Sequence, residues 1–313
     1  MKSPSDITLG SFIGDALALG PHWIYDQGLI REKLGRVTTF QPPLSTYHKG
    51  KSAGDFTHYG DQTLVLLRSL AQGGDYDLTR FASAWQEFWG NPSCLSYRDG
   101  ATKATLANLQ SGVSPANAAS PSNDIAGAAR IGPLFLLKWA DDDALLEAVK
   151  SQTAFTHGDP AVIEAAEFFA RVVLALQSGM NMEAALQHVT ALGIRTDLLS
   201  DWLGNAERSA SSPVTDAAAL QQHGLTCHVD DAFPGICHLL LRHPQDPATA
   251  LIENVDAGGD SAARGMILGL VYGAQFPVAD WSEGWVDGLH ALPEIKALIQ
   301  KLSSSMSVPT NKH

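Results

Sequence analysis

Residues 260–276 read DSAARGMILGLVYGAQF, and in this stretch Gly265, Gly269 and Gly273 recur at every fourth position. This period places them on one face of a helix, where small residues let another helix approach closely. Residues 1–20 carry a matching stripe, formed by Gly10, Gly14 and Ala18. We therefore expect two central helices that face each other, with their N-terminal ends beside a buried site.

The same spacing occurs in pairs of membrane helices, but charges and length argue against a membrane here. Asp6 and Asp15 interrupt the first apolar run, and Arg264 lies in the second. No stretch approaches the roughly 20 uncharged apolar residues that span a bilayer. The interruptions also argue against a secretion signal. We expect a soluble, cytoplasmic protein with no membrane partner.

Apolar residues at helical spacing run through almost the whole chain. After Pro160, a good first helical residue, they share one face at Val162, Ala165, Phe169, Val172 and Leu176. No series of segments alternates apolar and polar residues, as the strands of a sheet would. The sequence therefore predicts an all-α fold. Further helices are expected at 62–72, 78–90, 100–110, 214–223, 246–254 and 284–302.

Two segments rich in Pro, Ser and Gly, residues 40–54 and 111–124, are expected to be loops. Neither resembles a long linker, and helical patterns continue on both sides. We therefore expect one domain over residues 1–303, followed by a flexible tail at 304–313.

Charge and cysteine content exclude several classes of protein. A formal charge of −12 and a pI near 5.3 argue against a nucleic-acid or anionic-lipid partner. Three cysteines are too few, and odd in number, for a disulfide scaffold. Cys227 and Cys237 lie ten residues apart without a Cys-x-x-Cys pair, so they do not predict a zinc site.

Two turns far apart in the sequence each place an aspartate after glycine at the start of a helix. In HYGDQT (58–63), Asp61 is placed to cap the helix that follows. In NVDAGGDSAARG (254–265), Asp260 or the serine after it would cap the helix, and Gly259 would let a ligand approach the backbone. Two convergent carboxylates are the minimum for holding a hard cation or activating a water.

Five stretches together resemble the ADP-ribosylglycohydrolase family in order and spacing, over about residues 7 to 275. They are GSFIGDALALGP (10–21), YGDQT (59–63), GAARIGPL (127–134), FTHGDP (155–160) and GGDSAARGMILGLVYGA (258–274). With LGPHWIYD at 19–26, the chain is most similar to a divergent branch that includes the J-type lens crystallins and selenoprotein J.

The resemblance implies a single-domain, orthogonal helical bundle with a cleft for ADP-ribose. It also implies hydrolysis of the bond that joins ADP-ribose to a protein side chain or a small acceptor. Family members typically hold two magnesium or manganese ions with Thr-Asp-Asp at the first turn and Asp-x-Asp-Thr at the second. This chain instead has Gly60, Asp61 and Gln62, then Asp260, Ser261, Ala262 and Ala263. The family glutamate after the first proline has no counterpart, because His22 and Trp23 follow Pro21.

These departures decide what we expect of the metals. Neighbouring dications need several carboxylates, and Asp61 and Asp260 supply only two negative charges. We therefore expect the two-metal site to be absent. At most one weakly bound Mg²⁺ or Mn²⁺ would be held by Asp61 and Asp260, helped by Asp15, Asp55 or Asp256.

Asp61 and Asp260 are the candidate catalytic residues. One of them would orient or deprotonate a water, and their charge would stabilise an oxocarbenium-like transition state. Arg264 would pair with Asp260 or Asp256 and stabilise a leaving diphosphate-ribose in place of a metal.

Other candidates for substrate binding have structural alternatives. His157 would contact a phosphate or ribose, or serve only in a loop. Arg130 would neutralise a phosphate, or pair with a structural acid. Trp23 would stack on adenine or the sugar, or pack in the core. The remaining candidates are Asp15, Gln62, Gly259 and Ser261.

A further charged stretch, residues 97–109, combines Tyr97, Asp99 and Lys103 near a helix start. We interpret it as a solvated first helical turn without chemistry.

Two functions follow. The first is hydrolysis of a glycosidic bond in an ADP-ribosyl or related ribosyl compound, either a small molecule or a modified protein. The alternative is a catalytically inactive protein that binds ADP-ribose or serves as a structural, crystallin-like body.

Overall fold

The structure, a computed structural model, describes residues 3–193 and 197–305. Within these ranges the chain forms fifteen α-helices and no sheet, which confirms the predicted all-α class. The helices are α1 (Pro4–Ala18), α2 (Gln27–Leu34), α3 (His58–Gly73), α4 (Leu78–Gly90), α5 (Gly100–Gln110), α6 (Ala126–Ala129), α7 (Asp142–Ala154), α8 (Pro160–Gln177), α9 (Met182–Ala191), α10 (Asp197–Ala210), α11 (Asp216–His223), α12 (Val229–Arg242), α13 (Pro247–Ala257), α14 (Ser261–Gly273) and α15 (Leu292–Ser305).

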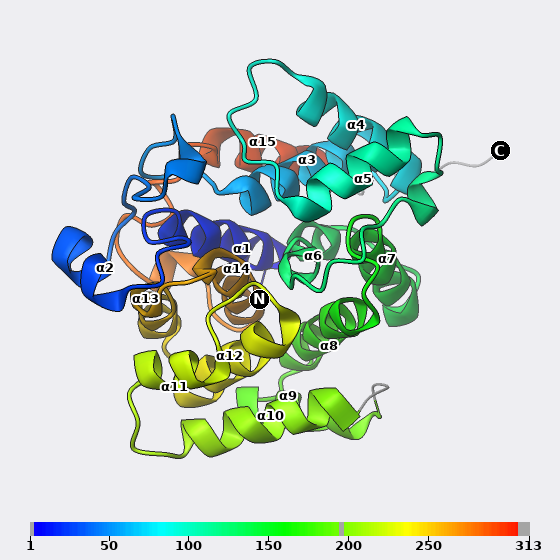
Figure 1. Ribbon diagram of the computed structural model, residues 1–313. Helices are drawn as coiled ribbons and strands as arrows, with labels where there is room; N and C mark the ends of the chain where they lie inside the picture. Colours follow the sequence, from blue (N-terminus) through cyan, green and yellow to red (C-terminus); the bar gives the residue numbers. More distant parts are fainter. Residues whose placement is uncertain (1–2, 194–196, 306–313) are drawn as a thin grey trace.

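Helices α1 and α14 lie at the centre of the molecule, with the other helices arranged around them (Figure 1). Every residue of α14 is buried, so this helix has no solvent face. A Cβ atom on Gly14 would overlap the carbonyl oxygen of Gly265, and one on Gly10 would overlap that of Gly269. The backbones therefore touch along the glycine stripes, as the sequence predicted.

The two central helices run antiparallel, because residue numbers rise along α1 as they fall along α14 at the contacts. The expectation that both N-terminal ends meet at one site is therefore wrong. The N-terminus of α14, at Asp260, instead lies beside the chain that leaves the C-terminal end of α1, because Trp23 N donates to the Gly259 carbonyl at 2.8 Å.

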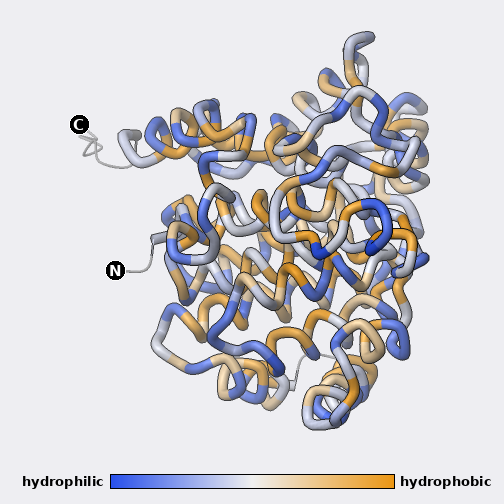
Figure 2. The backbone as a smooth tube through the Cα atoms, turned by 90° about the vertical axis from the view of Figure 1, so that its left-hand side faces the viewer, coloured by the Kyte–Doolittle hydropathy of each residue, from blue (hydrophilic) through white to orange (hydrophobic). Residues whose placement is uncertain are grey.

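Hydropathy follows this arrangement. In the backbone trace of Figure 2, hydrophobic residues are frequent at the centre of the molecule. Outer helices such as α15 alternate between hydrophobic and hydrophilic residues. Among the described helices, none combines the length and the apolar character needed to cross a bilayer.

The helices expected at 62–72, 214–223 and 246–254 have ends shifted by up to four residues, and the last helix differs more. The helix expected at 284–302 begins only at Leu292, because residues 284–291 form turns and Pro293 favours a helix start. It continues to Ser305, past the domain end expected at 303. The rest of the expected tail, residues 306–313, lies outside the described part of the chain.

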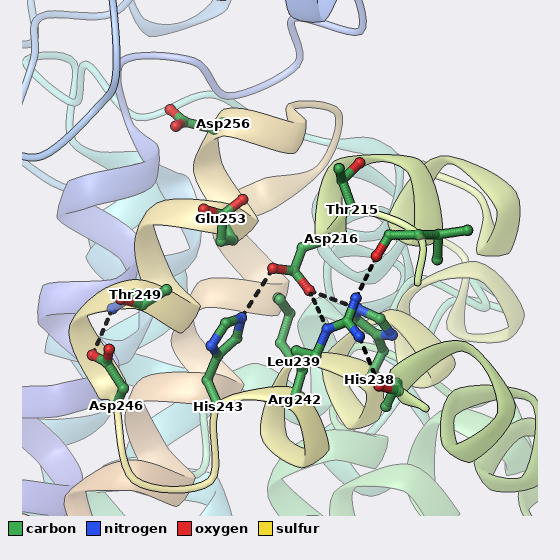
Figure 3. A network of polar contacts seen from close by, with 12 residues as sticks. Thr215, Asp216, His238, Leu239, Arg242, His243, Asp246, Thr249, Glu253 and Asp256 are labelled. Carbon is green, nitrogen blue, oxygen red and sulfur yellow. Dashed lines mark hydrogen bonds and ion pairs between the residues drawn. The ribbon is translucent and has the colours of Figure 1, made fainter. Parts of the chain in front are cut away.

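A network of hydrogen bonds and ion pairs links α11 and α12 to each other and to the end of α10 (Figure 3). Asp216, at the start of α11, lies 2.9 Å from His238 Nε2 and 3.0 Å from His243 Nε2. Arg242 reaches the same carboxylate at 3.5 Å and donates to the Ala210 carbonyl at 2.8 Å. Burial alone would raise the pKa of Asp216, but the hydrogen bonds and charges of the two histidines outweigh it and lower the pKa below its ordinary value.

We predict that Gly14→Ala destabilises the protein. The added methyl group has to displace the α14 backbone, an overpacking that lowers the free energy of unfolding by about 1–3 kcal/mol. Urea denaturation measures the change. Gly90→Ala is the control, since a Cβ there meets open space. A Gly14→Ala variant as stable as the parent would show that the helices can separate without cost.

We also predict that Asp216→Asn lowers the free energy of unfolding at pH 7 by about 1–3 kcal/mol, because buried donors lose a charged acceptor. A lowered folded-state pKa stabilises above the unfolded-state pKa of about 3.9, and the benefit is lost as pH falls below it. The difference between variant and parent should therefore shrink below about pH 4 in urea titrations. The exposed Asp201→Asn is the control. An equal effect of both variants would rule out a special role for the Asp216 network.

Candidate functional site

Backbone hydrogen bonds between distant loops build a polar site at the N-terminus of α14. Gly259 N donates to the Ile24 carbonyl at 2.8 Å, and Asp260 N donates to the Leu225 carbonyl at 2.9 Å. Ile125 N donates to the Cys227 carbonyl at 2.8 Å. These bonds bring the segments around residues 24, 125, 226 and 259 together, although they are far apart in the sequence.

Asp260 is the centre of this site. It caps α14, accepting from Ala263 N at 3.4 Å, so the prediction that this residue or Ser261 caps the helix is confirmed for Asp260. Its carboxylate also accepts from Trp23 Nε1 at 3.1 Å and from the Tyr59 hydroxyl at 2.9 Å. With 1% of its surface exposed, the group is held almost entirely by protein donors.

A second carboxyl group, Asp124, faces Asp260. The Tyr59 hydroxyl lies 3.3 Å from Asp124 as well, so one hydroxyl joins the two side chains. One ligand atom each from Asp124, Cys227 and Asp260 lie within 4.8 Å of one another. Burial and the charge of Asp260 raise the pKa of Asp124 well above its usual range. Burial, with both carboxylates nearby, also raises the pKa of the Cys227 thiol.

The predicted catalytic residue Asp61 belongs to a different group of contacts. The expectation that it caps α3 is wrong, because Thr57 is the cap and Asp61 lies in the first turn. Its carboxylate pairs with Lys51 Nζ at 2.5 Å. Among the described residues, Asp61 and Asp260 share no hydrogen-bond or ion-pair partner.

Asp15 lies close to Asp61, at the base of α3. It is fully buried and accepts from Thr57 N at 2.7 Å and from Thr57 Oγ1 at 2.6 Å. Burial raises its pKa to about 6, although the Thr57 bonds oppose the rise.

Gln62, Arg130 and His157 form a buried polar chain. Arg130 Nη1 donates to Gln62 Oε1 at 2.7 Å, and Trp85 Nε1 donates to the same oxygen at 2.9 Å. Arg130 also donates to Thr156, whose hydroxyl lies 2.8 Å from His157 Nδ1. Burial lowers the pKa of Arg130 to about 10, whereas nearby acids including Asp99 and Asp124 oppose this. The structure thus brings these three predicted residues together, next to the acidic pair.

The two ring nitrogens of His157 differ in their contacts. Its Nε2 has no hydrogen-bond partner in the described part of the chain, although the residue is 1% exposed. Burial, then the charge of Arg130, lowers the pKa of His157 to about 3, so the ring is neutral.

Arg264 does not form the ion pair expected with Asp260 or Asp256. It is fully buried and donates to Asn254 Oδ1 at 2.9 Å and to the Gly258 carbonyl at 2.6 Å. Asp256 is instead engaged by Arg36 at 3.4 Å. Arg264 therefore braces the glycine turn before Asp260. Burial lowers its pKa to about 10.

The remaining candidates lie at the same turn. Gly258 and Gly259 adopt positive φ angles of 77° and 67°, where a side chain would be strained. The Ser261 hydroxyl is buried without a hydrogen-bond partner among the described residues.

Trp23 covers the site. It has a positive φ of 62°, which is uncommon for a residue other than glycine and marks strain held by its surroundings. Its ring stacks on His22 at 4.5 Å and on His48 at 5.4 Å between centroids. Edge contacts with Tyr47 and Tyr97, at 5.1 and 5.2 Å, extend the aromatic surface outward. Trp23 is therefore partly buried, and its ring is stacked against His22 and His48.

Several site residues were not predicted. Asp99 is the main correction: instead of lying in a solvated turn, it is 9% exposed and faces His58 Nε2 at 3.2 Å. Burial opposes ionisation, but the hydrogen bond and charge of His58 lower the pKa of Asp99 overall. His58 and Tyr59 are the first two residues of the stretch HYGDQT, so the sequence did carry a signal for both. Asp124 gave no sequence signal, because a backbone pairing with residues 227–229 sets its place.

The residues present do not fit a pair of hard dications. Gln62 Oε1 already accepts two donors, Asp15 accepts two from Thr57, and Lys51 neutralises Asp61. Ala262 and Ala263 offer only buried methyl groups. Magnesium requires near-octahedral oxygen coordination, which this donor set does not provide.

Comparison with known proteins agrees with this architecture. Crystallin J1A of Tripedalia cystophora is 21% identical over 326 residues, covering 95% of each chain. An uncharacterized protein of Archaeoglobus fulgidus is 25% identical over 299 residues, covering 94% of this chain and 93% of that protein. A solved structure described as an ADP-ribosylglycohydrolase-related protein complex shares the fold. It has a TM-score of 0.68 and 20% identity, and covers 98% of this chain and 100% of that chain.

The sequence model of one family, ADP-ribosylglycohydrolase, matches residues 6–311, nearly the whole chain. The chain therefore belongs to the ADP-ribosylglycohydrolase family.

Proposed function

We propose that this protein hydrolyses a glycosidic bond in an ADP-ribosyl or related ribosyl compound, using Asp124 and Asp260. The observation that carries the proposal is the single Tyr59 hydroxyl that joins two buried carboxyl groups, at 3.3 and 2.9 Å. Family membership supports a glycosidic hydrolase of this kind. Asp260 keeps the role predicted for it, whereas we reassign the second role from Asp61 to Asp124.

Proton counting assigns the two roles. A tyrosine hydroxyl has one hydrogen and can donate to only one carboxylate. The shorter contact goes to Asp260, which also accepts from Trp23 and Ala263. The contact with Asp124 therefore needs a proton on Asp124, and its raised pKa favours that state. A carboxylic acid whose pKa is raised by burial, beside a second carboxyl group, suits the role of a general acid.

The chemistry follows from this division. Asp124 donates its proton to the departing oxygen or nitrogen as the bond to the ribose anomeric carbon breaks. The Asp260 carboxylate stabilises the oxocarbenium-like centre and accepts a proton from the attacking water, whose oxygen joins that carbon. Asp260 then holds a proton taken from the water, and Asp124 has given its own proton to the leaving group. Tyr59, which contacts both side chains, lies on the path by which a proton passes from Asp260 back to Asp124.

Two features support a ribosyl nucleotide as the substrate class. Tyr25 and Tyr47 are 52% and 53% exposed, and Tyr25 lies near enough to Asp260 and Asp124 for their charges to help raise its pKa, so exposed aromatic rings lie close to the site. Aromatic faces of this kind stack on nucleobases. His157 Nε2 and the Ser261 hydroxyl, both unpaired among the described residues, are available to substrate hydroxyl or phosphate groups.

We further propose that catalysis needs no pair of magnesium ions. Lys51 forms an ion pair with Asp61, and Arg130 donates a hydrogen bond to Gln62. Positively charged side chains therefore contact two residues of the turn that resembles a metal-binding turn of the family.

A second candidate function is a catalytically inactive, crystallin-like protein. Burial favours it, because Asp260 and Asp124 are only 1% and 8% exposed. A hollow of about 760 Å³ lies elsewhere, along α3 and α4, and none of the site residues named above lines it. Similarity to crystallin J1A is compatible with this function.

We predict that Asp124→Asn and Asp260→Asn each lower kcat by about 10²–10⁴-fold, because each removes one partner of acid–base catalysis. Release of free ribose-containing product from ADP-ribosyl-arginine, ADP-ribosyl-serine and simple ribosides measures the effect. Asp61→Asn is the matched comparison and should retain most of the activity. The reverse order of effects would return the catalytic role to Asp61.

No release by the parent protein would overturn the hydrolase proposal. Calorimetry with ADP-ribose then separates the remaining functions. Heat of binding without turnover identifies a binding protein, whereas no binding supports the structural function.

For the metals, we expect elemental analysis after dialysis against magnesium to find at most one ion per chain. The reason is that the oxygen donors near Asp61 already have protein partners. Two ions per chain would show that these donors exchange their partners for metal.

A further inference from the structure

Three histidines pack together beside the acidic pair without the partners that buried polar rings require. His22, His48 and His58 all have 0% relative exposure. No ring nitrogen of His22, His48 or His58 meets the geometry of a hydrogen bond within the described ranges, and His58 Nε2 has an ion-pair contact with Asp99. Buried polar atoms without partners are rare in proteins, and each one calls for an explanation such as an ion.

The three rings converge in space. They come from three separate segments, after α1, at the 3-10 turn Thr46–His48 and at the start of α3. One ring nitrogen from each lies within 4.8 Å of the other two. A tetrahedral ion with metal–nitrogen distances of about 2.0–2.1 Å separates its ligands by about 3.3 Å. To bind one ion, the three nitrogens would have to move closer to one another by at most about 1.5 Å.

His58 also has the partner expected of a metal ligand. Its Nε2 lies 3.2 Å from Asp99 Oδ2, which leaves Nδ1 free to coordinate. Metal-binding histidines commonly donate their second N–H to a carboxylate, which fixes the ring and raises its basicity. Asp99 is itself held in place, because Thr102 N donates to its other oxygen at 2.6 Å.

We propose that His22, His48 and His58 bind one divalent transition-metal ion, with zinc as the best match. Three neutral imidazoles suit zinc and its neighbours in the first transition row, whereas magnesium prefers oxygen ligands. Its three ligands differ from Asp61 and Asp260, the residues at the turns that resemble the family's metal-binding turns.

Asp260 lies at the edge of this proposed site. Its Oδ1 is 3.9 Å from His22 Nδ1, and together with Asp99 it supplies negative charge next to the ion. A zinc site with three histidines keeps a fourth position for water or a ligand. Metal binding here does not depend on the hydrolase proposal, because it is measured without substrate.

Aromatic packing is the competing explanation. His22 and His48 stack on Trp23, and the three ring centroids lie 5.3 to 6.2 Å apart. Packing accounts for the ring faces but leaves the edge nitrogens without partners, whereas an ion would bind one nitrogen of each ring.

The test is a metal titration of the full-length, untagged protein after removal of metals with a chelator. We expect one Co²⁺ per chain with the intense visible absorption of a tetrahedral site, displacement of Co²⁺ by one Zn²⁺, and a rise in Tm with zinc. His48→Gln and His58→Gln should each abolish the cobalt spectrum. Asp99→Asn, which keeps all three ligands, should weaken zinc affinity about 10–100-fold.

His188→Gln, at an exposed histidine of α9, is the matched control and should bind as the parent does. Circular dichroism checks that each variant is folded. Failure of the folded parent to bind cobalt or zinc at one per chain would overturn the proposal, and so would retention of the spectrum in both folded histidine variants.

Discussion

The contact between the glycine stripes of α1 and α14 is the constraint on which the rest of the structure depends. Without side chains at Gly10, Gly14, Gly265 and Gly269, the two backbones touch. This close approach sets the depth at which α14 is buried, and hence the place of Asp260 at its N-terminus. Because the helices run antiparallel, the segment that leaves α1 has to pass beside Asp260, which positions Trp23 and His22 over the carboxylate.

Two buried polar clusters result. In one, Tyr59 joins the carboxyl groups of Asp124 and Asp260; in the other, His22, His48 and His58 share a pocket with Trp23. Low polarity strengthens every electrostatic interaction between them and makes an unpaired group costly. The same burial that raises the pKa of Asp124 leaves ring nitrogens of the three histidines without hydrogen-bond partners among the described residues. Lys51 and Arg130 occupy the neighbouring acidic and amide groups, where the family places magnesium.

Sequence patterns were sufficient for the fold, because helical periodicity and the glycine stripes are local properties. They also identified Asp260, Arg130, Gln62 and His157, which do lie in or beside one site. They were insufficient where a position depends on pairing between loops. Asp124 reaches Asp260 through backbone bonds to residues 227–229, and Asp99 turns inward because His58 faces it. A charged helix start on the surface and a buried cap have the same sequence pattern, so Asp99 was misread.

The antiparallel pairing of α1 with α14 also has a consequence for biosynthesis. Helix α1 leaves the ribosome before α14, yet its residues from Ile7 onward are buried in the folded protein. Its partner begins at Ser261, so at about 5–20 residues per second the apolar helix waits for roughly 10–50 seconds. During that interval the nascent chain exposes an apolar surface, so α1 cannot reach its buried position until α14 has been synthesised.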